Sequence, residues 1–370
     1  MTASPVRSAP PQRAPAVRTL RLGTRASALA LAQSRQVAAR IEAAALGAGA
    51  PVRVELVEVT THGDVSTAPL SSFGGVGVFV SRLRDALLDR RVDVAVHSLK
   101  DLPTTPAPGL EVVAVPVRED PRDVLVARDG LTVGELPAGS VIGTGSPRRA
   151  AQLRALGLGL EVADIRGNVD TRMRHVAEGR YDAVVLARAG LLRLGRAAEA
   201  TEVFDPLLML PAPGQGALAV ECRSAGTGGG EHDEAVRAAV RGLDDPDSRA
   251  AVTAERSLLA ALEAGCAAPL GALAEVMEGD DGPELYLRAV AASLDGALTL
   301  RRSAVGPPAL ALELGRRLAA ELLADGARDL VPATGSTATT GTTDPTDSSD
   351  TSRTGTTSTA STTRSREGDL

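Results

Sequence analysis

An amine and a carboxylate stand next to each other where an apolar segment ends. Residues 92–96 (VDVAV) predict a short buried strand, and Lys100 and Asp101 follow it closely. Lys100 is the single lysine among 40 Lys and Arg residues. This favours a position that needs a compact ammonium group; chance survival in an Arg-rich chain is the alternative. Asp101 is the best candidate for an active carboxylate, with a turn-capping aspartate as the alternative.

Arginines gather where predicted strands give way to helices. Residues 142–196 contain ten Arg against five Asp or Glu, although the whole chain has a net charge of −6. Such junctions are the ligand-binding edge of α/β folds, and a guanidinium fork suits carboxylates and phosphates. We therefore expect an anion site, with a solvated charged face as the alternative, at Arg25, Arg148, Arg149, Arg166 and Arg172. We expect Arg154, Arg180, Arg193 and Arg196 to lie on a solvated face.

The two cysteines differ in their surroundings. Cys222 follows an apolar run and is expected in the core. Cys266 comes after Gly265, just past a predicted helix, so its thiol could serve as a nucleophile or an attachment point; an inert loop cysteine is the alternative. Two cysteines exclude a disulfide scaffold and a four-thiolate zinc site. No His, Cys and Asp cluster has metal-ligand spacing, so we expect no metal.

Composition excludes several classes of protein. Aromatic residues make up 1% of the chain and Trp is absent, which argues against stacking on single-stranded nucleic acid. An acidic chain with a pI near 5.4 is a poor match for a nucleic-acid or membrane-surface coat. No stretch reaches the ~18 apolar residues of a membrane-spanning helix. Segment 74–77 (GGVG) lacks the lysine of a phosphate-binding loop, and is expected to be a lid or an ordinary flexible loop.

Short apolar runs alternate with helical patterns, which predicts an α/β fold. The first unit has expected strands at 52–59, 92–96 and 111–115, and helices at 28–45 and 79–89. The second has strands at 141–143, 161–165 and 182–187, and a helix that Ser146 caps and Pro147 opens. The third has helices at 247–264 and 308–324, and strands at 284–291 and 297–301.

Two Pro- and Gly-bearing connectors, 116–121 and 211–216, indicate that the chain crosses into a second lobe and returns. Ligands of two-lobed proteins bind between the lobes. The expected organisation is a disordered leader 1–18, domain 1 at 19–116 plus 217–240, domain 2 at 117–216, domain 3 at 241–332 and a disordered Ser/Thr-rich tail 333–370.

Taken together, the motifs resemble those of the hydroxymethylbilane synthase (porphobilinogen deaminase) family. The resemblance covers nearly all of residues 19–332. It rests on segments 23–27 (GTRAS), 61–64 (THGD), 74–79, 93–103 (DVAVHSLKDLP), 118–123 (REDPRD), 143–149 (GTGSPRR), 166–168 (RGN) with Arg172, 210–216, 254–256 (AER) and 265–266. It implies three α/β domains. The first two resemble a two-lobed periplasmic binding protein, and the third is a small α+β domain.

The same resemblance implies roles for individual residues. Cys266 matches the cysteine that binds a dipyrromethane cofactor through a thioether, and Asp101 matches the carboxylate that stabilises positive charge on the pyrrole nitrogens. The implied cofactor-binding residues are Lys100, Arg148, Arg149, Arg172, Ser98, Thr144 and Ser146. The implied substrate-binding residues are Arg25, Ser27, Arg166, Arg172 and Gln215.

The implied protein is a cytoplasmic, monomeric transferase that joins porphobilinogen units head to tail and releases ammonia. Val76 and Ser81 depart from the family, because both positions usually carry basic residues. Ala264 and Ala268 are smaller departures near the cysteine. The alternative is a two-lobed carboxylate-binding protein without catalysis, against which the third domain with Cys266 and the lack of a signal-like segment count.

Overall fold

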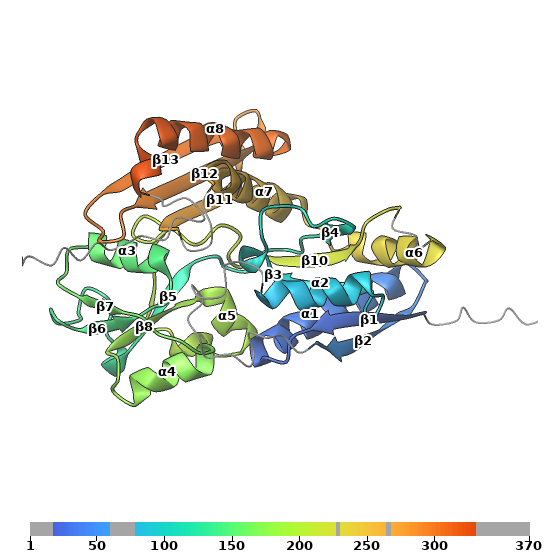
Figure 1. The fold of residues 1–370 in the computed structure, drawn as a ribbon, viewed down its shortest axis with the longest axis horizontal. Helices are drawn as coiled ribbons and strands as arrows, with labels where there is room; N and C mark the ends of the chain where they lie inside the picture. Colours follow the sequence, from blue (N-terminus) through green and yellow to red (C-terminus); the bar gives the residue numbers. More distant parts are fainter. Residues whose placement is uncertain (1–17, 60–77, 227–229, 264–267, 331–370) are drawn as a thin grey trace, which may run out of the picture. The chain divides into compact units, whose positions relative to one another are not determined.

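The computed structural model describes residues 18–59, 78–226, 230–263 and 268–330, all within one contact unit of the chain, Met1–Thr334. Three β-sheets with their helices organise these residues (Figure 1). The Gly-rich segment 74–77, Cys266 and the expected tail lie outside the described residues. So does the expected leader, apart from its last residue, Arg18, which begins a strand.

The first sheet has the strand order β2-β1-β3-β10-β4. Strands β1 (Arg18–Thr24), β2 (Val52–Glu58) and β3 (Val94–Ser98) are parallel, whereas β10 (Leu218–Arg223) runs antiparallel between β3 and β4 (Leu110–Ala114). Helices α1 (Ala28–Gly47), α2 (Val78–Leu88) and α6 (Gly230–Arg241) pack on this sheet. The core of this sheet contains Leu20, Leu22 and Val94, which are buried and pack with Val37 and Ile41 of α1.

The second sheet repeats this plan, with the order β7-β6-β8-β5-β9. Strands β6 (Val141–Gly143), β7 (Glu161–Ala163) and β8 (Ala183–Ala187) are parallel, and β5 (Asp123–Ala127) runs antiparallel to β8 and to β9 (Glu202–Val203). Its helices are α3 (Pro147–Ala155), α4 (Val169–Ala177) and α5 (Arg188–Arg193). In both sheets a strand from a distant part of the chain runs antiparallel to the others, as expected where the chain crosses between two lobes.

The two crossing segments touch each other. The chain passes from β4 to β5 through residues 115–122 and returns from β9 to β10 through residues 204–217. Glu119 N donates to Gly216 O at 3.4 Å. Gly216 has a φ of +86°, and a Cβ there would lie 2.3 Å from Glu119 O. Glycine is therefore required at this point by both the backbone conformation and the contact.

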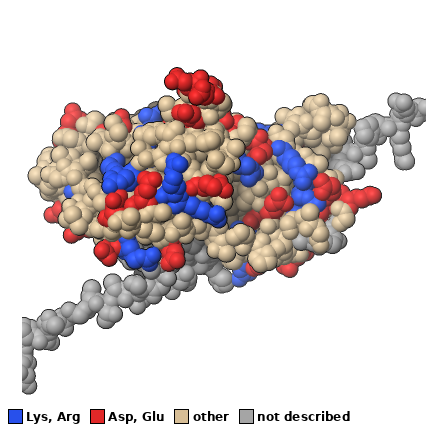
Figure 2. Space-filling view, turned by 90° about the horizontal axis from the view of Figure 1, so that it is seen from above, with Lys and Arg blue, Asp and Glu red and all other residues tan. Residues whose placement is uncertain are grey.

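The third sheet is antiparallel, with the order β11-β12-β13. Its strands are β11 (Leu270–Gly279), β12 (Gly282–Ala292) and β13 (Thr299–Gly306), and α7 (Pro246–Ala261) and α8 (Ala311–Ala324) pack on it, followed by the short α9 (Ala327–Leu330). Gly315 permits α7 and α8 to approach closely, because a Cβ there would lie 2.3 Å from Ala254 O. Oppositely charged side chains intermingle on the face seen in Figure 2. Arg302 of β13 forms an ion pair with Asp325, which follows α8, at 2.8 Å.

Two expectations about the elements were wrong. The helix expected at 247–264 ends at Ala261, because Glu263 adopts a left-handed φ of 52° and stops the helical turn before Gly265. Strand β11 was not expected at all. Its first five residues are all buried, so they lack the alternation of polar and apolar side chains on which strand prediction depends.

Candidate active site

Lys100 and Asp101 lie on a tight turn at the carboxyl end of β3. The turn is a short 3-10 helix, Leu99–Asp101, whose first residue is 2% exposed and anchors it to the core. Leu99 N donates to Ala217 O at 3.0 Å, which ties the turn to the start of β10. Asp101 is exposed, so its carboxylate is accessible to solvent on a turn that buried Leu99 anchors.

Lys100 is connected across the crossing segments to a buried carboxylate. Its Nζ donates to Gln215 Oε1 at 3.2 Å, and Gln215 Nε2 donates to Asp123 Oδ1 at 2.8 Å. Gln215 is 1% exposed and also donates to Pro121 O at 2.7 Å. Burial lowers the pKa of Lys100 to about 8; the charge of Asp101 opposes this shift and that of Arg149 adds to it. This amine is therefore still mostly charged near neutral pH.

Asp123, the first residue of β5, is fully buried and balances two arginines. Arg149 donates to its Oδ1 through Nη2 at 2.7 Å and Nε at 3.1 Å, and Arg148 Nη1 lies 2.8 Å from its Oδ2. Burial alone would raise the pKa of Asp123, but the charges of Arg148 and Arg149 hold it well below the ordinary value. The sequence prediction assigned no role to Asp123; an acid at the start of an otherwise apolar run (DVLVA) was the available signal.

Both arginines come from the first turn of α3, as predicted. Ser146 is the N-cap and its Oγ accepts from Arg149 N at 3.5 Å, while Pro147 occupies the first turn. Thr144 Oγ1 accepts from Ser146 N at 3.2 Å and fixes the approach to the helix. The side chains of Arg148 and Arg149 are 4% and 7% exposed. Two buried positive charges therefore lie close to the N-terminus of α3, which itself favours anions.

Two further predicted cations follow β7 in the same lobe. Arg166 is exposed and pairs with Asp164 at 3.1 Å, and Arg172 of α4 donates to Gly167 O at 2.9 Å. Burial lowers the pKa of Arg172 to about 10, and the nearby positive charge of Arg149 adds to the shift. The electrostatic interaction between Arg149 and Arg172 shows that α3 and α4 bring their cations to one region.

The first lobe contributes the remaining predicted residues. Arg25 follows β1 directly and is half-buried. Ser27 caps α1, where its Oγ accepts from Ala30 N at 3.3 Å. Ser98 ends β3 and its Oγ accepts from Gln33 Nε2 at 3.0 Å. All three lie at the carboxyl ends of the neighbouring parallel strands β1 and β3, the edge at which α/β sheets bind ligands.

One arginine was misjudged from the sequence. Arg193, expected on a solvated face, is half-buried, and its Nη2 donates to Gly216 O at 2.6 Å in the second crossing segment. Burial lowers the pKa of Arg193 to about 10, while the charge of Glu119 opposes the shift. Arg180 and Arg196 do pair with acids at the surface, and the exposed Arg154 donates to Leu294 O at 2.6 Å. Arg193 thus connects α5 to the second crossing segment.

The third lobe holds both crossing segments through one buried carboxylate. Glu255 of α7 is 0% exposed; its Oε1 and Oε2 accept from Arg118 at 2.7 and 3.0 Å. Gly214 N donates to Oε2 at 2.6 Å and Ala274 N to Oε1 at 2.8 Å. Its place on the buried face of α7, between Ala251 and Leu258, was the available signal in the sequence.

The site fits a group that carries several carboxylates. Five cations (Lys100, Arg148, Arg149, Arg166 and Arg172) face only three carboxylates among the partners described above, Asp101, Asp123 and Asp164. Arg148 Nε is buried without a hydrogen-bond partner among the described residues. A cationic excess with an unpartnered donor matches a polycarboxylate ligand. The described residues contain no His, Cys, Asp and Glu group able to hold a metal ion, and no helix among them could span a membrane.

Comparisons with known proteins agree with this geometry. Residues 20–228 match the family described as porphobilinogen deaminase, dipyromethane cofactor binding domain, and residues 249–324 match its C-terminal domain. Porphobilinogen deaminase of Nocardia farcinica is 56% identical over 323 residues, covering 86% of this chain and 89% of that protein. The Mycobacterium avium and Mycobacterium tuberculosis proteins of the same name are each 55% identical over 317 residues, covering 84% of this chain and 96% and 98% of theirs. The chain belongs to the porphobilinogen deaminase family.

Proposed function

We propose that Asp101 is the residue on which this family's reaction depends in this chain. The chain is a transferase of tetrapyrrole biosynthesis: it joins four porphobilinogen units head to tail into hydroxymethylbilane, and releases ammonia as each unit is added. The observation that supports the role of Asp101 is its position. It is an exposed carboxylate on a rigid turn beside a buried amine that is connected to Gln215 and Asp123.

The cations bind and orient the carboxylate side chains. Each porphobilinogen unit carries an acetate and a propionate, so the growing chain brings many negative charges into an acidic protein. Arg25, Ser27, Arg166 and Arg172 would bind substrate. Gln215, also expected there, is buried and bonded to Lys100, Asp123 and Pro121 O, so it would act by positioning Lys100. Guanidinium forks from two strand edges and two helices give the directional, charge-assisted hydrogen bonds that hold such groups in register.

Asp101 supplies the negative charge that stabilises the positively charged pyrrole during the reaction. Loss of ammonia leaves positive charge on the pyrrole of the incoming unit, and a fixed carboxylate stabilises such charge better than mobile water does. Lys100 is on the same turn, where its amine donates to Gln215 and would pair with carboxylates of the cofactor. The turn thereby separates binding by Lys100 from catalysis by Asp101.

The dipyrromethane cofactor of this family serves as the primer to which porphobilinogen units are added. We assign its attachment to Cys266, which lies outside the described residues, and its carboxylates to Lys100, Arg148, Arg149, Arg172, Ser98, Thr144 and Ser146. The excess of cations over carboxylates and the buried Nε of Arg148 support this assignment. We also propose that the enzyme works as a cytoplasmic monomer, as the resemblance to its family implies.

Substitution of Asp101 tests the assignment. Asp101→Asn keeps the shape and removes the charge, so turnover should fall by ~100- to 1000-fold, while the intact mass still shows bound cofactor. Asp101→Glu restores the charge at a slightly displaced position and should lose less. Near-normal turnover of Asp101→Asn would make Asp101 a turn-capping residue and overturn the assignment.

A further inference from the structure

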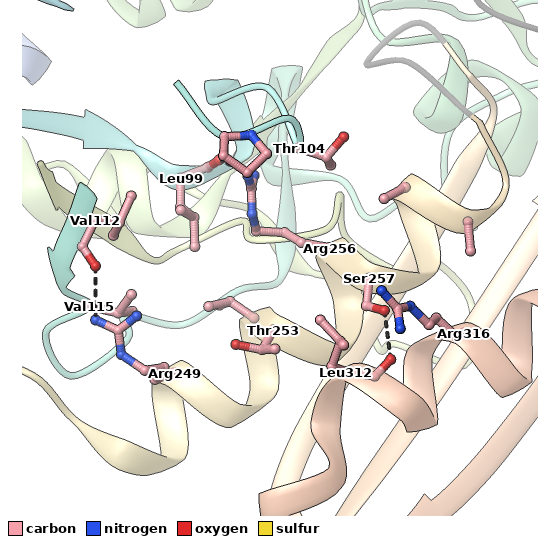
Figure 3. A pocket seen from close by; sticks show the side chains of 14 residues that line it. Leu99, Thr104, Val112, Val115, Arg249, Thr253, Arg256, Ser257, Leu312 and Arg316 are labelled. Atoms are coloured by element: carbon pink, nitrogen blue, oxygen red, sulfur yellow. Dashed lines mark hydrogen bonds between the residues drawn. The ribbon is translucent and has the colours of Figure 1, made fainter. Parts of the chain in front are cut away.

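A cavity lies beside Leu99, the first residue of the Lys100–Asp101 turn, between the first and third lobes. It has a volume of about 560 Å³, within the range of small-molecule sites. Its walls come from α7, from Leu312 and Arg316 of α8, from β4, and from the loop that holds Thr104 and Pro106 (Figure 3). Neither Asp101 nor any residue of the second lobe lines it. The cavity is therefore distinct from the proposed active site.

One face of α7 forms the floor of this cavity. Arg249, Val252, Arg256 and Ala260 recur at spacings of three and four residues, which places them on one side of a helix. The opposite side of α7, with Ala254 and Leu258, is buried against the third sheet. The cavity-facing side is therefore the side of α7 that the third lobe leaves uncovered.

The cavity is positively charged. Three arginines line it, and no acidic residue does. Arg249 pairs with Asp244 at 2.7 Å and donates to Val113 O at 3.0 Å. Arg316 is exposed and makes no hydrogen bond or ion pair with any described residue; Figure 3 shows its side chain beside Ser257 and Leu312. A guanidinium at the mouth of a cavity without acids is an attractive position for an anion.

The walls are largely apolar. Leu312 is 40% exposed and Val112 is half-buried, and the buried side chains of Leu99, Val115 and Val252 lie behind this surface. A compact inorganic anion would satisfy Arg316 and leave these walls in contact with water. A ligand with an apolar body covers Leu312 and Val112 and gains from their burial.

We propose that this cavity binds an organic carboxylate with an apolar body, its carboxylate paired with Arg316 and its body against Val112, Val252 and Leu312. The paired oxygens of a carboxylate match the guanidinium fork, whereas an uncharged ligand of the same body would forgo this pairing.

The cavity is also connected to the catalytic turn. Arg256 donates to Leu102 O at 2.9 Å, Pro103 O at 2.7 Å and Leu99 O at 3.3 Å, and so holds the backbone on both sides of Lys100 and Asp101. A ligand that contacts Arg256 should change the turnover number without competing with porphobilinogen. This consequence rests on the proposed role of Asp101, whereas binding itself does not.

Calorimetric titration of octanoate into the cofactor-loaded enzyme tests the proposal. We expect octanoate to bind, and Arg316→Gln to weaken its affinity by about 10- to 100-fold, the value of one charge-assisted contact. Arg317→Gln is the matched control, because Arg317 is the next residue of α8, is exposed and does not line the cavity. That variant should bind octanoate like the unmodified enzyme. Both variants should unfold at the temperature of the unmodified enzyme, because both arginines are exposed.

Two further ligands separate the alternatives. Octanol, which has the same chain without the charge, should bind at least about tenfold more weakly than octanoate, and inorganic phosphate should not displace octanoate. Equal affinity of octanoate for the unmodified enzyme and Arg316→Gln, no binding at all, or displacement by phosphate would each overturn the proposal. Inhibition by octanoate that competes with porphobilinogen would place it in the active site and would overturn the proposal as well.

Discussion

Arg118 and Glu255 form a two-pronged ion pair in the interior, with N–O distances of 2.7 and 3.0 Å. Arg118 belongs to the first crossing segment, and Glu255 also accepts from Gly214 N in the second. Arg118 Nε donates in turn to the backbone O of Gln215 at 2.8 Å, the residue whose side chain accepts from Lys100. One carboxylate of the third lobe therefore fixes both connections between the other two lobes.

Glu255→Gln should destabilise the protein by about 3–5 kcal/mol, because it leaves the largely buried guanidinium of Arg118 without its counter-charge. Urea unfolding followed by circular dichroism measures the change. Glu275→Gln is the matched control: Glu275 pairs with Arg288, but its side chain is 49% exposed, so the loss should stay within about 1 kcal/mol. Equal losses in the two variants would contradict the role of Glu255 in fixing the two crossing segments.

Lys100 can be titrated directly because it is the only lysine of the chain. In cofactor-free protein labelled at lysine Cε, we expect one carbon resonance with a pKa of about 8, lowered chiefly by burial. A folded-state pKa below that of the unfolded chain also means that the free energy of unfolding rises with pH between about 8 and 10.5, since the unfolded chain holds the proton longer. Titration near the value of a free lysine would show that the amine is solvated.

Asp123 should make the free energy of unfolding depend on pH in the acid range. Its pKa lies below the ordinary value, so its contribution is present above the carboxyl's normal range and is lost as pH falls below it. We expect Asp123→Asn to cost about 3–5 kcal/mol at pH 7 and the cost to shrink between about pH 4 and 2, measured by urea unfolding across pH. Asp280→Asn, at an exposed residue, is the control. A cost that does not change with pH would mean that Asp123 is not the charged partner of Arg148 and Arg149.

The parts of the site that the sequence predicts are those with local signals. The Ser146 cap, the first-turn arginines and the Lys100–Asp101 turn are each encoded within a few neighbouring residues, and the structure has them as expected. Asp123 and Glu255 were missed because their partners are distant: Arg149 lies 26 residues from Asp123, and Arg118 lies 137 from Glu255. Arg193 was misjudged for the same reason, since its acceptor, Gly216 O, belongs to the returning crossing segment.

The strands likewise divide into those with a local sequence signal and those without one. Strands β5, β10 and the first half of β11 are buried on both faces, so no alternation marks them in the sequence. Helix α7 was predicted, but its end was not, because Glu263 rather than a glycine adopts the left-handed conformation there. Periodicity and caps report what a segment does locally, and burial on both faces or an unusual backbone angle depends on the rest of the fold.

We propose that this chain builds hydroxymethylbilane on a dipyrromethane cofactor bound to Cys266. Cys222 is the natural control, because it is 1% exposed and burial raises the pKa of its thiol to about 12. Intact-mass spectrometry of the purified protein tests the claim most directly, before and after porphobilinogen is added. The unmodified protein and Cys222→Ser should carry the cofactor mass and then gain successive porphobilinogen-derived increments, whereas Cys266→Ser should carry neither. A bare polypeptide mass that porphobilinogen does not change, or a cofactor mass that persists in Cys266→Ser, would contradict the account.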